Sequence, residues 1–139
     1  MIMLIIATLV AGTIGGFTDW LFMGVLFHEA YNRHPEVWRD GVREGKSRGA
    51  ILWSAALGYL MTAAVVFLCV LAGVAKMRAG VLVGALCWVT PACVIVINNM
   101  FVKMDRKITI AHVAGYGARL LVAGAAAGLA LGRLVHLAG

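Results

Sequence analysis

The sequence predicts an all-α fold: an integral membrane four-helix bundle with up-down topology and a short interfacial helix in its first loop. The first observation is composition, since 63% of the 139 residues are hydrophobic and 13% are charged, against about 45–50% and about 25% in soluble domains. The second is that the apolar residues form four runs of about 20 or more residues, enough to cross a bilayer. We expect the whole chain, 1–139, to form one transmembrane domain.

The four predicted spans cover about residues 2–27, 50–74, 79–102 and 108–131. The first holds one acid, the second holds no charge, the third holds a proline and two adjacent asparagines, and the fourth holds a histidine and an arginine. We expect helices because lipid offers no partner to an unpaired backbone group. The connections at 75–78 and 103–107 are very short, so the spans they join must run antiparallel.

The first connection, 28–49, is the longest one between the predicted spans. Pro35 suits the first turn of a helix, and Glu36 then lies near the positive end of the helix dipole. Trp38 and Val42 are four residues apart and share a helical face. The pattern predicts a short helix at the cytoplasmic interface, with Trp38 among the lipid headgroups.

Basic residues are divided unevenly between the two sides. The loops after spans one and three carry eight, namely Arg33, Arg39, Arg43, Lys46, Arg48, Lys103, Arg106 and Lys107; the other side carries Lys76, Arg78 and Arg133. Cytoplasmic loops are enriched in Lys and Arg, so we predict that loops 28–49 and 103–107 are cytoplasmic and both termini are outside. The formal net charge of +6 therefore reports topology. No nucleic-acid partner is expected, because no basic stretch is interleaved with aromatic residues.

Two residues with formally charged side chains fall inside the predicted spans, Asp19 and Arg119. A charge at the bilayer centre costs about 2.5–3.5 kcal/mol on insertion scales, so such residues usually face the bundle interior and pair. Their distances from the cytoplasmic ends differ by about 4–5 Å, which an arginine side chain can span. We predict an ion pair that fixes span one on span four. If span one continues as a helix into the cytoplasm, the pair is weaker or absent.

Polar side chains gather in the cytoplasmic half of the predicted bundle. His112, Tyr116 and Arg119 are spaced i, i+4, i+7 and form one stripe of span four. The candidate ligand or ion-path residues are Asp19, Arg119, Tyr116, His112, Asn98, Asn99 and Tyr59. Two interpretations stay open: a polar path open to the cytoplasm, or an internal hydrogen-bond cluster that specifies packing.

Small residues at four-residue spacing predict close helix contacts. Gly124, Gly128 and Gly132 lie on the face of span four away from the polar stripe, and Gly12 and Gly16 repeat in span one. The glycine face of span four is expected to pack on a neighbour in the same chain or on a second copy. The expected partners are therefore the lipid bilayer and either further copies of the chain or other membrane subunits.

The sequence leaves the cofactor unknown, and a metal stays an open question. His28, Glu29 and His112 all lie near the cytoplasmic face, but they form a metal site only if the fold brings them together. The chain has no P-loop, dinucleotide-binding glycine motif or Ser-His-Asp order. No catalytic residue is assigned, and an enzyme is less favoured than a protein without catalytic activity.

One segment resembles a known group of proteins. Residues 15–27, with the sequence GGFTDWLFMGVLF, followed by PEVW at 35–38, are similar to small uncharacterised four-span bacterial inner-membrane proteins. The resemblance implies the four-span fold and a bacterial inner membrane, and it implies no activity or site.

Three function classes follow from these features. The intramembrane Asp and Arg favour a small oligomeric transporter or channel. The absence of a substrate motif favours an accessory or structural subunit of a larger membrane complex. A metal- or lipid-active membrane enzyme is the third hypothesis. A tunnel between the spans favours transport, whereas a closed bundle with an exposed glycine face favours the subunit.

Overall fold

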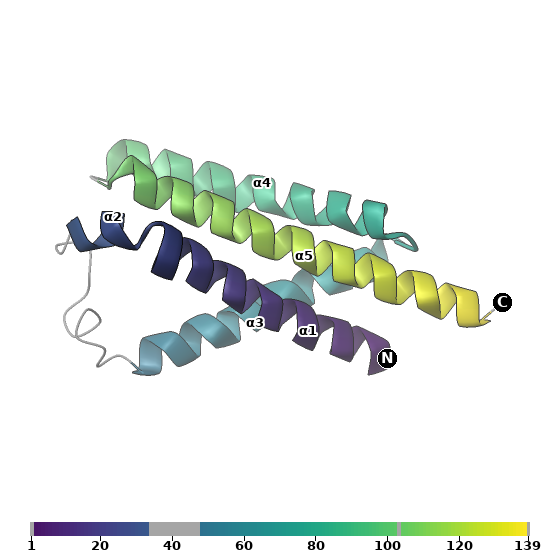
Figure 1. The fold of residues 1–139 in the computed structure, drawn as a ribbon. Helices are drawn as coiled ribbons and strands as arrows, with labels where there is room; N and C mark the ends of the chain where they lie inside the picture. The colour runs from purple at the N-terminus through teal and green to yellow at the C-terminus, as the bar shows by residue number, and fades with distance from the viewer. Residues whose placement is uncertain (1, 34–47, 103, 139) are drawn as a thin grey trace.

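The computed structural model describes residues 2–33, 48–102 and 104–138, and these residues form helices and no strand. The helices are α1 (Ile2–Asp19), the π-helix η1 (Trp20–Leu26), α2 (His28–Arg33), α3 (Arg48–Leu71), α4 (Met77–Phe101) and α5 (Arg106–Ala138) (Figure 1). Four helical segments within this part of the chain are long and apolar enough to cross a membrane: Ile2–Leu26, Arg48–Leu71, Met77–Phe101 and Arg106–His136. The all-α fold with four long apolar helices is confirmed.

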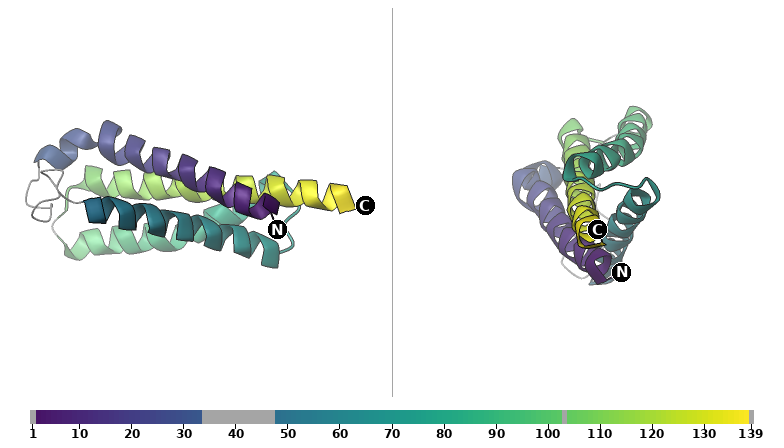
Figure 2. Two further views of the ribbon diagram at one scale, coloured as in Figure 1. Left: turned by 90° about the horizontal axis from the view of Figure 1, so that it is seen from below. Right: turned by 90° about the vertical axis from the view of Figure 1, so that its right-hand side faces the viewer.

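Helix α5 is central to the bundle. Helices α1 and α3 pack against it and against each other, and α4 lies along another side of it (Figures 1 and 2). Within the described residues neither α1 nor η1 contacts α4. The four helices therefore do not surround one common interior, and the polar groups of α1 and α4 are kept apart by α5.

The first span changes its helix type directly after Asp19. Trp20–Leu26 is a π-helix, and the N–H of Phe27 donates to the carbonyl oxygen of Phe22 at 3.1 Å. The span ends close to the predicted residue, but the α-helical spacing used for the prediction does not include this wider turn. Most π-helical segments are single-turn bulges and are frequent at functional sites.

Helix α3 ends in a Schellman motif. The N–H of Gly73 donates to Val70 O at 3.0 Å, and the N–H of Val74 donates to Cys69 O at 3.0 Å. Gly73 has φ 62°, a left-handed conformation that glycine adopts without the steric penalty of a Cβ atom. This glycine ends the helix a few residues before the predicted boundary and turns the chain toward α4.

Helices α4 and α5 touch through their backbones. A Cβ atom built on Gly80 would lie 2.0 Å from the carbonyl oxygen of Gly124, and one on Gly124 would lie 2.1 Å from that of Gly80. Similar approaches hold along the seam: Gly84 against Leu120, Gly128 against Lys76, and Gly132 against Ala75. The glycine face of span four therefore packs on a neighbour in the same chain and not on a second copy, the two alternatives that the sequence left open. Gly80 and Gly84 are the partners that the sequence did not identify.

Trp88 adds a polar contact to this seam. Its indole Nε1 donates to the carbonyl oxygen of Val113 at 2.8 Å. A Trp88→Phe substitution is expected to lower the free energy of unfolding by about 1 kcal/mol, the typical net value of one hydrogen bond. The measurement is detergent-induced unfolding in micelles. The exposed Trp53 provides the matched control, since Trp53→Phe removes an indole that has no such bond to any described residue; equal effects of the two changes would contradict the assignment.

The glycines of span one were assigned only partly correctly. A Cβ on Gly12 would lie 2.3 Å from the ring of Tyr59, so Gly12 is a close-approach site between α1 and α3. Gly16 is exposed, and no described residue lies within 4 Å of a Cβ atom built on it, so Gly16 is not a close-approach site among the described residues of the chain. Gly15, one residue earlier, faces the bundle instead, because α1 turns that side toward α5.

Two apolar cores stabilise the bundle at different levels. One joins α3, α5 and the start of α4 around Val66, Cys69 and Ala123. The other lies at the α2 end, where Tyr31 packs against Ile108 and Ala111. Arg119 lies in α5 between residues of the first core and residues of the second. Asp19 lies in the same way between Leu4, which packs on the first core, and Met23, which packs on the second. The polar site is thus held by apolar packing on both sides.

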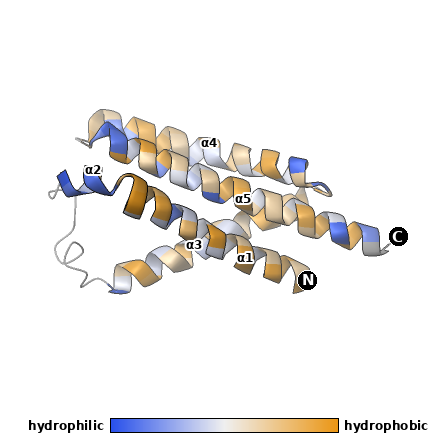
Figure 3. Cartoon of the chain, viewed as in Figure 1, coloured by the Kyte–Doolittle hydropathy of each residue, from blue (hydrophilic) through white to orange (hydrophobic). Residues whose placement is uncertain are grey.

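The end of the molecule that carries α2 also carries the turn before α5. Met104 packs with Tyr31 and Ile108 at this end, so α2 and the turn before α5 lie together. The hydrophilic colour gathers at both ends of the molecule, at α2 and the start of α5 and again at the start of α4 and toward the end of α5, while the middle of the long helices is mostly apolar (Figure 3). The short helix in the first connection is His28–Arg33; the predicted interfacial segment around Pro35, Trp38 and Val42 lies outside the described residues.

Candidate functional site

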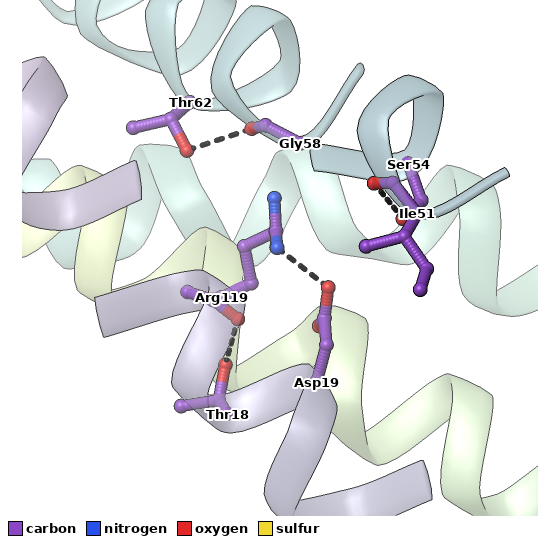
Figure 4. Close-up of polar contacts among 8 residues, drawn as sticks. Thr18, Asp19, Ile51, Ser54, Gly58, Thr62 and Arg119 are labelled. Atoms are coloured by element: carbon purple, nitrogen blue, oxygen red, sulfur yellow. Dashed lines mark hydrogen bonds and ion pairs between the residues drawn. The ribbon is translucent and has the colours of Figure 1, made fainter. Parts of the chain in front are cut away.

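The predicted ion pair is present between α1 and α5. Arg119 Nη2 donates to Asp19 Oδ2 at 2.5 Å (Figure 4). Arg119 is 3% exposed, and the Asp19 side chain is 26% exposed. Arg119 lies about 20 Å along α5 from its first residue, and its side chain reaches back toward the α2 end. The pair therefore forms even though η1 continues the helix of α1 to Leu26, so a continued helix does not remove it.

Two glycines make the space that the guanidinium occupies. A Cβ on Gly15 would lie 2.9 Å from Arg119 Cγ, and a Cβ on Gly58 would lie 1.9 Å from Arg119 Nη1. Gly58 is held in place by Thr62, which is fully buried and donates its hydroxyl to Gly58 O at 3.0 Å. Arg119 is thus enclosed between α1 and α3 by residues without side chains.

Gly58→Ala is expected to displace the guanidinium and weaken the ion pair, since the new methyl group would overlap Nη1. Overpacking of this kind costs about 1–3 kcal/mol. Unfolding in detergent measures the loss. Gly49→Ala, in the same helix with no described residue within 4 Å of a built Cβ atom, is the control and is expected to be neutral or slightly stabilising, because alanine favours helices. Similar values for the two variants would show that Gly58 does not limit the space of Arg119.

The pair does not satisfy all of its own polar atoms. Asp19 Oδ1 and Arg119 Nε are buried and have no hydrogen-bond partner within the described residues. Buried polar atoms usually have partners, and leaving one unpaired costs about 1–3 kcal/mol. The site therefore has one unused acceptor on the carboxylate and one unused donor on the guanidinium.

A row of rings leads from the α2 end toward the pair. Tyr31 Oη lies 3.2 Å from His112 Nε2, within hydrogen-bond distance. The rings of His112 and Tyr116 are stacked, with centroids 6.2 Å apart. Tyr116 precedes Arg119 by one helical turn on the same stripe of α5, as the spacing predicts. Tyr31 is the member of this row that the sequence did not identify.

Burial raises the pKa of Tyr31 to about 12, and the nearby Tyr116 contributes to this rise. The unfolded phenol ionises near its ordinary value of 10. Stability from this group is therefore complete below pH 10 and falls as the pH rises toward about 12, by on the order of 2 kcal/mol. Unfolding measured across this alkaline range is expected to show the fall in the wild type and not in Tyr31→Phe. A parallel fall in both would assign it to other groups.

A groove runs between α1 and α3 on the outer side of the pair. Its volume is about 440 Å³, and it is lined by apolar and small residues that include Gly16, Phe17, Trp20 and Ala55, together with Tyr59 and Arg119. Tyr59 Oη is hydrogen-bonded to Thr13 Oγ1 at 2.8 Å at its edge. Tyr59 thus belongs to the groove and not to the ring row, and Arg119 is the charged residue in the groove lining.

The asparagines are not brought to the pair. Asn98 and Asn99 lie near the end of α4, Asn98 is exposed, and α4 makes no contact with α1 or η1 in the described part of the chain. The prediction that they join one polar cluster with Asp19 is therefore wrong, because α5 separates the two helices.

The weak metal candidates are also kept apart. His112 contacts Tyr31, Glu29 pairs with Arg33 four residues later, and His28 is exposed. The hydrogen bond from Arg33 lowers the pKa of Glu29, so this carboxylate is engaged in its own helix. No group of three or more His, Cys, Asp or Glu side chains that could hold a metal ion occurs within residues 2–33, 48–102 and 104–138.

Sequence patterns could not identify the two glycines that make space for the Arg119 side chain. Gly15 and Gly58 sit in different helices and face a side chain from a third one. The only local signal is that Gly15 precedes Asp19 by one turn, on the same face of α1.

Comparison of the chain with protein-family models, curated proteins and solved structures finds no match. The ion pair, the ring row and the groove therefore carry the functional proposal by their own chemistry. Together they offer a buried positive charge with a free donor, a carboxylate with a free acceptor, and an apolar surface beside them.

Proposed function

We propose that this chain is an integral membrane protein that carries a small solute across the membrane, with the Asp19–Arg119 pair as its polar site. One observation supports this more than any other: Asp19 Oδ1 and Arg119 Nε are buried and unpaired in the described structure. A pair that serves packing alone gains stability by satisfying every polar atom. Intramembrane ionisable residues commonly mark substrate or ion pathways.

In this proposal the four helices cross a bacterial inner membrane in up-down order. The end that carries α2 faces the cytoplasm, and both termini face outside. The support is the concentration of basic residues at that end, where Arg33, Arg48, Arg106 and Lys107 lie in or beside the helix ends. The opposite end carries Lys76, Arg78 and Arg133. Many large apolar side chains, such as Phe67 and Leu86, point outward, as contact with lipid requires.

The proposed path has two parts that meet at the ion pair. The ring row of Tyr31, His112 and Tyr116 connects the cytoplasmic end with Asp19, and the groove between α1 and α3 lies on the other side of Arg119. A solute that takes the place of Asp19 on Arg119 separates α1 from α5 at this level. Opening and closing of the ion pair is then the gate.

The test is uptake of radiolabelled solute by liposomes that contain the purified protein. Weak acids, amino acids, sugars and monovalent cations are added in turn. At least one class is expected to cross faster than through protein-free liposomes, with the rate at least tenfold lower for Asp19→Asn. His112→Gln, which leaves the ion pair in place, is expected to slow the flux while the fold is kept. Equal fluxes with and without protein for every class would overturn the proposal.

A second candidate function is that of an accessory subunit in a larger membrane complex. It is favoured by α4, whose most apolar stretch is 11% buried inside the chain, against 22–33% for the other three segments. The outer side of α4 is therefore the least covered surface for another subunit or a further copy. Native mass spectrometry of the protein extracted from its own membrane separates the two functions: different subunits in a stable complex favour the accessory role.

A further inference from the structure

A pocket at the end of the molecule opposite α2 brings together three basic residues from two parts of the chain. Lys76 directly precedes α4, whereas Arg133 and His136 lie near the end of α5. All three are exposed, and the hydrophilic colour at the start of α4 and toward the end of α5 marks this region (Figure 3). The pocket has a volume of about 420 Å³, and its other lining residues are small or apolar: Ala75, Met77, Gly128, Leu129 and Gly132.

No acidic side chain balances this charge within residues 2–33, 48–102 and 104–138. The acidic residues of that part are Asp19, Glu29 and Asp105, which lie in α1, in α2 and in the turn before α5. The side chains of the three basic residues form neither an ion pair nor a hydrogen bond to another described residue. Helix α4 begins beside them with no acidic residue in its first turn, so the positive end of its dipole adds to their potential. The pocket therefore fits an anion.

An apolar groove adjoins this basic pocket. It lies between α1 and α5, has a volume of about 400 Å³, and is lined by Met3, Ile6, Ala7, Val10, Ala126, Leu129, Ala130 and Arg133. Leu129 and Arg133 line both the groove and the pocket. From Arg133 the groove extends to Ala126, about 10 Å deeper along α5. A positive site at the helix ends is therefore continuous with an apolar groove that runs toward the middle of the spans.

We propose that this surface binds one phospholipid of net negative charge, with its phosphate at Lys76, Arg133 and His136 and an acyl chain in the groove between α1 and α5. Arginine and lysine both bind phosphate oxygens, and basic pockets between membrane helices bind anionic headgroups. The order of the two parts also matches a bilayer, where headgroups lie outside the hydrocarbon core and chains point into it. The site is separate from the Asp19–Arg119 pair and does not depend on transport.

Other occupants satisfy fewer of these features. The amine of a zwitterionic phospholipid would find no acidic partner among the described residues that line the pocket. A soluble phosphate compound fits the basic pocket and leaves the apolar groove unused. Basic residues near the end of α5 also interact favourably with the negative end of its dipole. That interaction is the same whichever lipid surrounds the helix, so a comparison of lipids separates it from lipid binding.

Native mass spectrometry tests the proposal on the full chain, released from micelles that contain equal amounts of phosphatidylglycerol and phosphatidylcholine with the same acyl chains. The wild type is expected to retain phosphatidylglycerol at least fivefold more than phosphatidylcholine. Lys76→Gln combined with Arg133→Gln is expected to remove this preference, and since both side chains are exposed, the variant is expected to fold. The control is Arg48→Gln combined with Arg106→Gln, which removes the same charge from exposed positions at the other end and is expected to keep the preference.

Two further measurements identify the occupant. Ala130→Phe places a ring in the groove and is expected to lower phosphatidylglycerol retention at least fivefold. Ala56→Phe, at an exposed position of α3 that does not line the groove, is expected to leave retention unchanged. An excess of glycerol 1-phosphate, which carries a phosphate without acyl chains, is expected to displace no lipid.

Four results would overturn the proposal. Equal retention of the two lipids by the wild type excludes an anionic lipid site, and an equal or larger loss of preference in the control pair assigns the preference to overall charge. Displacement by glycerol 1-phosphate assigns the pocket to a soluble phosphate compound. Unchanged retention in Ala130→Phe removes the acyl chain from the groove, and a simultaneous change from dimer to monomer assigns the groove to a second copy.

Discussion

Asp19→Asn is expected to lower the free energy of unfolding by about 3–5 kcal/mol, the usual cost of breaking a buried ion pair by removing one partner. The cost arises because Arg119, 3% exposed, keeps its charge between apolar helices with no counter-charge. Arg119→Gln is expected to cost a similar amount, since it strands Asp19 and empties the space beside Gly15 and Gly58. Unfolding in mixed micelles, titrated with a denaturing detergent, measures both.

The double variant Asp19→Asn with Arg119→Gln separates the interaction energy of the pair from the energy of the other contacts of each side chain. Both side chains are then neutral and each has donors and acceptors, so the double variant is expected to be more stable than the sum of the single losses predicts, by at least about 1 kcal/mol. Additive losses in this cycle are the outcome that contradicts the ion pair. Tyr59→Phe removes a hydroxyl at the edge of the groove between α1 and α3. Its loss in the free energy of unfolding is expected to add to the loss caused by either single change.

Gly124→Val is the second change with a large expected effect. A Cβ at this position would lie 2.1 Å from the carbonyl oxygen of Gly80. Backbone atoms cannot rotate away as a side chain can, so α4 must separate from α5 along the whole seam. The expected loss is above about 3 kcal/mol, the upper part of the range for overpacked sites. Thermal unfolding in micelles and the loss of the Trp88 environment, seen in its fluorescence, report the separation.

Gly16→Val serves as the control for this change. It introduces the same side chain into the interior of a helix, so the change in intrinsic helix propensity is comparable, but Gly16 has nothing within 4 Å. Its effect on stability is expected to be within about 0.5 kcal/mol, as for surface substitutions. Losses of the same size in both variants would mean that valine itself, and not the α4–α5 contact, is the cause.

The seam between α4 and α5 shows how far spacing can predict packing. The repeat of Gly124, Gly128 and Gly132 correctly predicted a close helix contact on that face of span four. It did not decide between a second copy and the same chain, because small residues permit approach by any backbone. Gly80 and Gly84 have the same four-residue spacing. Only the placement of the two helices side by side shows that these glycines face α5.

In the candidate site too, the sequence predicted some contacts and missed others. The spacing of His112, Tyr116 and Arg119 predicted their common stripe, and the cost of intramembrane charge predicted the partner of Arg119. The sequence also assigned Asn98 and Asn99 to this cluster, which the central position of α5 excludes. Tyr31 was overlooked because it lies in a short helix of six residues outside the spans.

The sequence by itself determined the four apolar helices, their approximate bounds and the identity of the charged pair. These follow from local quantities: hydropathy over about 20 residues, helical periodicity, and the free energy of one charge in lipid. The tertiary structure alone decided which glycines meet which backbones, that Gly15 and Gly58 enclose Arg119, and that a groove lies between α1 and α3. The physical reason is that close packing depends on the shapes of two or three helices together, and residues far apart in the chain acquire those contacts only when the helices are assembled.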